Sequence, residues 1–231
     1  MTAAKRHHAC LRATTVLAGV ALLAACSSGS ANRSSPPSAV PATALDGLLL
    51  SANAVGDVMG TPGMVADPPF TILGENSNLL PNRNCLGIWV VGEKAIYGDS
   101  NLTGFRGQGL QHPATGAWDV KVVQGVASYP SPDASRAFFN ASADRWSKCT
   151  NHHVNMTVNG QQLPKLWFGN LTKTDNQLSM PITEGEGDTQ RSCQRVLSLA
   201  GNIIIDVAAC NRNAADQAET IASKIKERLP R

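Results

Sequence analysis

Cysteine is the residue type with the widest chemical reach in this 231-residue chain, and it occurs six times. A thiol can bind a metal, accept a lipid or oxidise to a disulfide, and cysteine spacing helps to separate these chemistries. No Cys-x-x-Cys spacing occurs, which argues against a metal site, and free buried thiols are the other alternative to disulfides. We therefore expect no metal and no other cofactor. The cysteines lie at positions 10, 26, 85, 149, 193 and 210.

Cys193 and Cys210 flank two runs of strand-forming residues that meet at Gly201-Asn202, a two-residue hairpin turn signal. With Gly201 and Asn202 as the loop, Cys193 lies directly opposite Cys210 in an antiparallel ladder. The alternation of pair types makes this a non-hydrogen-bonded pair, whose Cα spacing of about 4.5–5.5 Å lies within the range of a disulfide. The register therefore predicts a bridge between Cys193 and Cys210.

The N-terminus has the pattern of a lipoprotein signal. A basic start is followed by an apolar run over residues 14–25, too short for the roughly 20 residues that span a bilayer. Leu23-Ala24-Ala25-Cys26 resembles the lipobox of bacterial lipoproteins at all four positions. The resemblance implies a signal peptide over residues 1–25, cleavage before Cys26, and acyl chains such as palmitate on the mature N-terminus. An ordinary cleaved signal with a chance cysteine is the alternative.

The compartment completes the cysteine assignment. Cys10 leaves with the signal peptide and Cys26 carries lipid, so four cysteines remain, an even number in an oxidising compartment. Since the hairpin register pairs Cys193 with Cys210, elimination pairs Cys85 with Cys149. We expect a protein anchored to the cell membrane by its lipid and facing the extracytoplasmic side.

Charge excludes one class of partner. The formal net charge of +3 comes from Lys5, Arg6 and Arg12 of the signal peptide; without these three of the 20 basic residues, 17 remain against 17 acidic ones. No basic tract is left to bind nucleic acid. Residues 26–43 are small, polar and proline-containing, which is typical of a flexible linker, and residues 44–231 have the length of one domain.

A serine could act as a nucleophile at Gly98-Asp99-Ser100-Asn101, which resembles the G-D-S block of one family of serine esterases. Such chemistry needs a histidine to take the serine proton, and in that family this histidine lies late in the chain. No histidine follows His153 here. We expect a turn at this block and no catalytic residue in the chain; an envelope serine hydrolase that uses Ser100 is the alternative.

Other polar groups have simpler interpretations. His152 and His153 point to opposite faces if they lie in a strand, so they do not readily bind one ion. Glu184, Glu186 and Asp188 alternate with glycines in what we interpret as a polar loop rather than a calcium site.

Arg195 and Asp206 share the cysteine face of the hairpin and are diagonal neighbours across it. They form either a structural ion pair or part of a ligand-binding surface, and we treat them as candidate ligand-binding residues. The opposite face of the hairpin carries Val196, Ile205 and Val207, together with Ile203, and is predicted to be core.

The remaining pattern predicts an α+β domain with a largely antiparallel sheet, packed helices and two disulfides. A helix from Ser131-Pro132 places Ala134, Phe138, Ala141 and Arg145 on one stripe. Helices are predicted at 52–59, 132–148 and 214–229, strands at 102–112, 118–129 and 177–183, and a second hairpin around Asn159-Gly160. Residues 85–97 fit a helix or a strand, and the helical spacing of Ile88, Val91 and Ala95 favours the helix.

The order of these pieces over residues 44–231 resembles the PknH-like extracellular sensor domain, found in some mycobacterial receptor serine/threonine kinases and in free-standing lipoproteins. The resemblance rests on the L-L-L-S and V-G-D-V-M-G-T-P-G-M segments, the S-P-D-A helix that ends at Trp146-Ser147-Lys148-Cys149, and the cysteine-flanked hairpin. It implies an α+β domain with bridges 85–149 and 193–210 and a cleft that holds an unidentified ligand. We identify no kinase domain and no transmembrane helix in this sequence, so we do not expect this chain to transmit a signal across the membrane by itself.

We therefore expect a mycobacterial-type cell-envelope lipoprotein with a sensor-like, ligand-binding domain that is not an enzyme. Its expected partners are the membrane, through the N-terminal lipid, and a small molecule or cell-wall fragment, with no nucleic acid. A protein-binding partner of envelope receptors is a further alternative.

Overall fold

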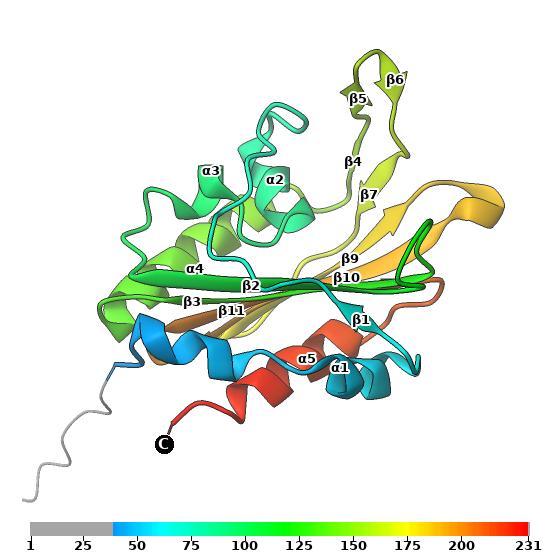
Figure 1. Ribbon diagram of the computed structural model, residues 1–231. Coiled ribbons are helices and arrows are strands. Elements are labelled where there is room, and N and C mark those ends of the chain that lie inside the picture. Colours follow the sequence, from blue (N-terminus) through cyan, green and yellow to red (C-terminus); the bar gives the residue numbers. More distant parts are fainter. Residues whose placement is uncertain (1–38, 231) are drawn as a thin grey trace, which may run out of the picture. The chain divides into compact units, whose positions relative to one another are not determined.

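An antiparallel sheet runs through the middle of the domain, with helices on both of its faces (Figure 1). The computed structural model of the chain describes residues 39–230. The predicted signal peptide, Cys26 and most of the predicted linker lie outside these residues. The strand order is β1-β2-β3-β11-β10-β9-β7-β4, with β8 also paired to β9, and all of these pairings are antiparallel. The predicted fold class is confirmed.

The sheet and its helices have the following bounds. The strands are β1 (Val65–Ala66), β2 (Gly104–His112), β3 (Val120–Ser128), β4 (His152–Val154), β7 (Leu166–Phe168), β8 (Thr172–Lys173), β9 (Gln177–Glu184), β10 (Arg191–Ala200) and β11 (Ile203–Asn211). One face carries α2 (Arg83–Trp89), α3 (Lys94–Tyr97) and α4 (Pro132–Ser147); the other carries η1 (Ala42–Leu48), α1 (Ala52–Met59) and α5 (Gln217–Lys226). A short η2 (Gly187–Thr189) precedes β10.

Each face of the sheet has its own hydrophobic core. Val196, Ile203, Ile205 and Val207 pack with η1, α1 and α5, so this predicted core is confirmed. The cysteine face of the same hairpin is buried too, against α2, α3 and α4. Because both faces are covered, most residues of β3, β10 and β11 are buried whichever face they lie on.

The hairpin of β10 and β11 has the predicted register. Cys193 pairs with Cys210, the two Cα atoms are 4.0 Å apart, and a disulfide joins the side chains. Gly201 adopts a positive φ of 58° in the turn, where glycine is favoured. The second predicted bridge, between Cys85 and Cys149, is also present and joins α2 to the residues that follow α4.

The predicted helix over residues 85–97 is two short helices, α2 and α3, with a turn between them. Gly92 has a φ of 67°, and a Cβ at this position would overlap the Phe105 ring. Glu93, which is fully buried, then caps α3 by accepting from Ala95 N. The helical spacing of Ile88, Val91 and Ala95 thus indicated the correct class of element but not the break at Gly92.

The second predicted hairpin is smaller than its pattern indicated. Only β5 (Thr157–Val158) and β6 (Gln161–Gln162) pair around the Asn159-Gly160 turn, and β7 and β8 are separate strands. Between them Gly169 packs closely against Pro181, and Gly169 N donates to Pro181 O at 2.9 Å. The terminal helix is also shorter than predicted, because α5 begins only after Asp216 and its last turn ends near Glu227.

Val40, which lies within the predicted linker of residues 26–43, is hydrogen-bonded to the turn of the central hairpin. The Asn202 amide accepts from Val40 N at 2.9 Å and donates to Val40 O at 3.1 Å and Tyr129 O at 2.9 Å. The turn therefore holds the segment around Val40. Within residues 39–230, no helix has the length and apolar character needed to cross a membrane.

We predict that the two disulfides differ in their contribution to stability. Removing the bridge between Cys85 and Cys149, 64 residues apart, should lower the free energy of unfolding by roughly 4 kcal/mol, and removing the bridge 17 residues apart by roughly 3 kcal/mol. Urea unfolding of the two double Cys→Ser variants measures both values. An unchanged midpoint in either variant would contradict the prediction.

Candidate functional site

Arg195 and Asp206 form a buried ion pair beneath the turn between α2 and α3. Arg195 Nη1 faces Asp206 Oδ1, and each side chain is 1% exposed. Arg195 sits opposite Ala208 and Asp206 opposite Leu197, so the two are diagonal neighbours as predicted. Because an isolated buried charge is very costly, each member of such a pair needs further hydrogen bonds.

Those further bonds come from the α2–α3 segment and from β11. The Arg195 guanidinium donates to Ile88 O at 2.9 Å, Val207 O at 2.8 Å and Val90 O at 3.2 Å. The second carboxylate oxygen of Asp206 accepts from Gly92 N at 3.1 Å and from the Tyr97 hydroxyl at 2.9 Å. The pair therefore connects the sheet to the backbone of the helical layer above it.

From the sequence we treated Arg195 and Asp206 as candidate residues of a ligand-binding surface, whereas in the structure they lie beneath a layer of helices. Helices α2 and α3 cover the cysteine face at Arg195 and Asp206, and both residues are buried. In this structure the two residues form a structural ion pair, the alternative named above, and a ligand cannot reach them directly.

Two tyrosines extend the buried polar group toward the surface. The Tyr97 ring lies 4.5 Å and the Tyr129 ring 5.5 Å from the Phe138 ring, measured between centroids. The Tyr129 hydroxyl lies 3.1 Å from Ser100 Oγ. Burial raises the pKa of both tyrosines, so both hydroxyls stay protonated at neutral pH and the Tyr97 hydroxyl donates to Asp206.

Phe138 and Ser100 form part of a cleft between α3 and α4, called here the α3–α4 cleft. Its volume is about 620 Å³, within the range of small-molecule sites. Its apolar lining consists of Ala95, Ile96, Ala134, Ala137, Phe138 and Ala141, and its polar lining of Arg83, Asp99, Ser100, Asn101 and Arg145. The α4 stripe predicted from the sequence, Ala134 to Arg145, is therefore one wall of this cleft.

Arg83 and Arg145 are the cations of the α3–α4 cleft. Arg83 Nη2 donates to Ala95 O at 2.7 Å, and Arg145 Nη2 donates to Ser142 Oγ at 2.9 Å. Neither guanidinium lies within 4.0 Å of a carboxylate among residues 39–230. Burial lowers the pKa of Arg145, and the positive charge of Arg83 lowers it further.

The sequence contained a signal for this pair of arginines that we did not use. Arg83 lies two residues before Cys85, and Arg145 lies four residues before Cys149. Since the disulfide joins these cysteines, it also brings the two arginines into one cleft. The predicted pairing and the helical spacing of Arg145 together indicated this arrangement.

Ser100 lacks the partners of a catalytic serine in the described structure. Its hydroxyl donates to Tyr97 O at 2.6 Å, as expected in the predicted turn. No histidine lines the α3–α4 cleft; of the described ones, His112 contacts Gly63 O, and His152 and His153 lie on β4. Within residues 39–230, therefore, no histidine is positioned to take the Ser100 proton.

The other polar clusters do not gather into a site. The His152 and His153 rings stack 6.1 Å apart on the exposed β4 strand. Lys165 Nζ pairs with Glu186 at 2.8 Å, in the predicted polar loop. Across residues 39–230, no group of three or more His, Cys, Asp or Glu side chains is arranged to hold a metal ion.

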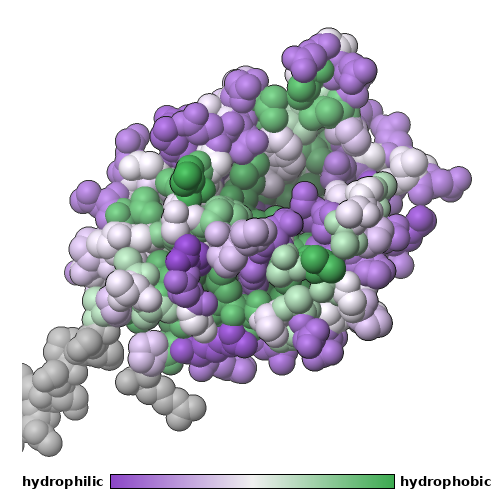
Figure 2. All heavy atoms as spheres, viewed as in Figure 1, coloured by the Kyte–Doolittle hydropathy of each residue, from purple (hydrophilic) through white to green (hydrophobic). Residues whose placement is uncertain are grey.

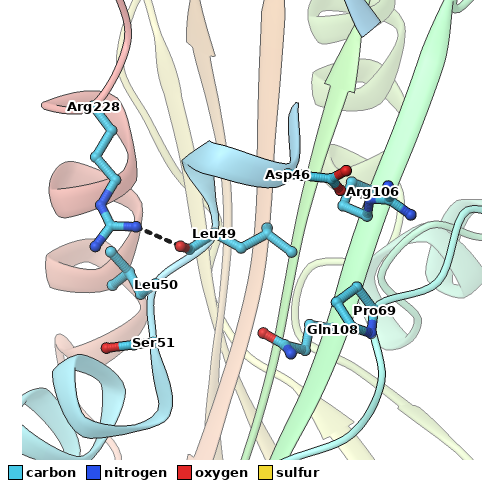
Figure 3. A pocket seen from close by; sticks show the side chains of 8 residues that line it. All are labelled: Asp46, Leu49, Leu50, Ser51, Pro69, Arg106, Gln108 and Arg228. Atoms are coloured by element: carbon cyan, nitrogen blue, oxygen red, sulfur yellow. Dashed lines mark hydrogen bonds and ion pairs between the residues drawn. The ribbon is translucent and has the colours of Figure 1, made fainter. Parts of the chain in front are cut away.

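A second cleft, of about 520 Å³, lies on the other side of the sheet, between η1, β2 and α5 (Figure 3). Two of its charged groups are paired with each other, since Asp46 on η1 forms an ion pair with Arg106 on β2. Arg228 donates to Leu49 O. The α3–α4 cleft is the better candidate site because, among the described residues, both of its guanidiniums lack a carboxylate partner, whereas in the second cleft only Arg228 lacks one.

The surface around these elements is mixed in character. Figure 2 shows small hydrophobic patches interspersed with hydrophilic residues on the face in view, rather than one continuous apolar area. A broad apolar patch would indicate a large protein or membrane interface. The visible face thus favours a confined site over an extended hydrophobic contact.

Comparison with known proteins identifies relatives of the described domain. Residues 40–228 match the family described as the PknH-like extracellular domain. The serine/threonine-protein kinases PknH of Mycobacterium bovis and Mycobacterium tuberculosis are each 29% identical over 194 residues, which cover 84% of this chain and 32% and 30% of the kinases. This chain therefore spans about a third of the length of those kinases.

A solved structure agrees with that match. The crystal structure of the extracellular domain of PknH from Mycobacterium tuberculosis aligns with a TM-score of 0.76 at 29% identity, and covers 82% of this chain and 96% of that domain.

We predict that breaking the buried ion pair destabilises the domain strongly. Arg195→Met or Asp206→Asn should each lower the free energy of unfolding by about 3–5 kcal/mol, because each leaves an unpaired buried group. The double variant should lose clearly less than the sum of the two, and urea unfolding of the four proteins measures this coupling. Additive losses, or single losses below about 1 kcal/mol, would show that the pair is not the structural link described here.

Proposed function

Because the chain belongs to the PknH-like extracellular domain family, we propose that it is a lipid-anchored cell-envelope protein whose sensor-like domain binds a small ligand in the α3–α4 cleft. Membership of this family implies an extracytoplasmic location. The two disulfides fit an oxidising compartment. The lipobox that ends at Cys26 supports the lipid anchor, and the expected ligand is a small molecule or a cell-wall fragment.

The lining of the α3–α4 cleft is the observation that best supports ligand binding. One wall is an apolar stripe on α4, and the same cleft holds two guanidiniums without a carboxylate partner. Small-molecule sites commonly combine a mainly apolar lining with a few polar groups that orient the ligand. A ligand here would touch Phe138, whose ring packs on Tyr97 and Tyr129.

A binding function is better supported than catalysis. The match to the PknH kinases is to their extracellular domain, which is not the catalytic part. Ser100 donates its proton to a backbone carbonyl and has no histidine beside it in the described structure. We therefore do not propose the serine hydrolase.

We predict that Cys26→Ser releases the protein from the membrane. The thiol is the expected site of acylation, and a single uncleaved apolar run of signal-peptide length holds a protein less firmly than two or three acyl chains. Expression in a mycobacterial host, followed by ultracentrifugation and partition into a nonionic detergent phase, measures the lipid-dependent fraction. Ser27→Ala is the matched control and should stay in the membrane; equal partition of the Cys26 variant would refute the anchor.

We predict that filling the α3–α4 cleft abolishes ligand binding. Ala141 lines the cleft, so Ala141→Trp should remove the rise in melting temperature caused by an envelope extract. Asn140→Trp, at the neighbouring exposed position outside the cleft lining, should leave that rise unchanged. If no fraction of the extract raises the melting temperature of the parent protein, the proposed function fails.

A further inference from the structure

We propose that the ligand of the α3–α4 cleft is an amphiphile with a phosphate head, which binds between Arg83 and Arg145 while its apolar body lies along the α4 stripe. This inference rests on the proposed function, since it names the chemical class for the same cleft. It makes two separate claims, one about the charge of the head and one about the apolar body, and the structure bears on each.

The first step concerns the two guanidiniums. Each is oriented by one hydrogen bond to the protein, Arg83 to Ala95 O and Arg145 to Ser142 Oγ. A guanidinium has five N–H donors in a planar fork, so most donors of each residue remain for a ligand. The side chains are thus held in place without being neutralised, which suits recognition of an oxyanion.

The second step concerns the balance of charge in and near the cleft. Asp99 lines the cleft and Asp144 adjoins Arg145 in sequence, yet neither forms an ion pair with Arg83 or Arg145. Two neighbouring cations, one of them half-buried, repel each other in the empty cleft. A phosphate monoester carries more than one negative charge near neutral pH and offers several acceptor oxygens, so a single head can bind both guanidiniums.

The third step concerns the rest of the ligand. Ala134, Ala137, Phe138 and Ala141 present small side chains and one aromatic ring, and Ile96 of α3 faces the same cleft. These groups offer no hydrogen bonds, so this wall favours an apolar body, while the polar residues Asp99, Ser100 and Asn101 also line the cleft. A volume of about 620 Å³ accommodates a short acyl or prenyl segment together with the head.

Binding of hexyl phosphate to the full chain carrying Cys26→Ser, measured by isothermal titration calorimetry, tests the inference. Hexyl phosphate should bind at least about tenfold more tightly than hexanol, which lacks the charge, and than inorganic phosphate, which lacks the apolar body. Inorganic phosphate that binds as tightly as hexyl phosphate would assign the site to the free ion and overturn the claim about the apolar body.

Variants separate the charge from a structural role. Arg83→Gln and Arg145→Gln should each weaken hexyl phosphate binding on the order of tenfold, while Arg145→Lys, which keeps the charge but loses the planar fork, should bind more tightly than Arg145→Gln and less tightly than the parent. Lys148→Gln removes a charge that lies just after α4 and outside the cleft lining, so it should change nothing. Cooperative urea unfolding of each variant establishes that it is folded.

The failure of this inference is distinct from the failure of the proposed function. If hexanol binds as well as hexyl phosphate, or if both Gln variants bind normally, the anionic head is wrong although the cleft still binds a ligand. If hexyl phosphate does not bind while an envelope extract raises the melting temperature in an Ala141-dependent way, the ligand class is wrong and the site stands. If neither binds, both proposals fall.

Discussion

The buried ion pair between Arg195 and Asp206 is the interaction on which the arrangement above the sheet depends. Two charges withdrawn from water are tolerated only when almost every donor and acceptor is used. The guanidinium finds its acceptors at the carbonyl end of α2, where helical C=O groups lack partners within the helix. Asp206 accepts from Gly92 N, which precedes α3, and from the hydroxyl of Tyr97, the last residue of α3. The pair thereby supplies hydrogen-bond partners to backbone groups that have none within α2 or the turn that follows it.

The width of the α3–α4 cleft depends on this ion pair. Helix α3 has only four residues, far fewer than a helix needs to persist by itself, so its position is fixed by what it packs on. Tyr97, its last residue, donates a hydrogen bond to Asp206 and packs against Phe138 of α4. The distance between α3 and α4, and hence the width of the cleft, is set by contacts that begin in the sheet.

The sequence predicted those parts of the structure that local signals specify. A Gly-Asn turn fixed the register of β10 and β11, and with it the Cys193–Cys210 bridge. Serine caps and a proline at the first helical position located α1 and α4. The helix break at Gly92 was missed because its causes, a close Phe105 ring and a bond to Asp206, come from distant segments.

The same limit explains why the sequence left two roles open for Arg195 and Asp206. Alternation along a strand shows which residues share a face, but not whether a further layer covers that face. Here two short helices, held partly by the pair itself, cover it. A polar pair on a strand face that looks exposed in sequence can therefore be the buried attachment point for the layer that hides it.

The disulfide between Cys85 and Cys149 has a positional consequence as well as an energetic one. It holds the start of α2 against the end of α4, and so keeps Arg83 and Arg145 in one cleft although their charges repel. At position 145, burial and the like charge of Arg83 oppose the guanidinium, whereas the carboxylate of Asp144 and the Phe138 ring favour it. An anion bound between Arg83 and Arg145 would relieve the repulsion between them, which is more characteristic of a binding site than of a structural contact.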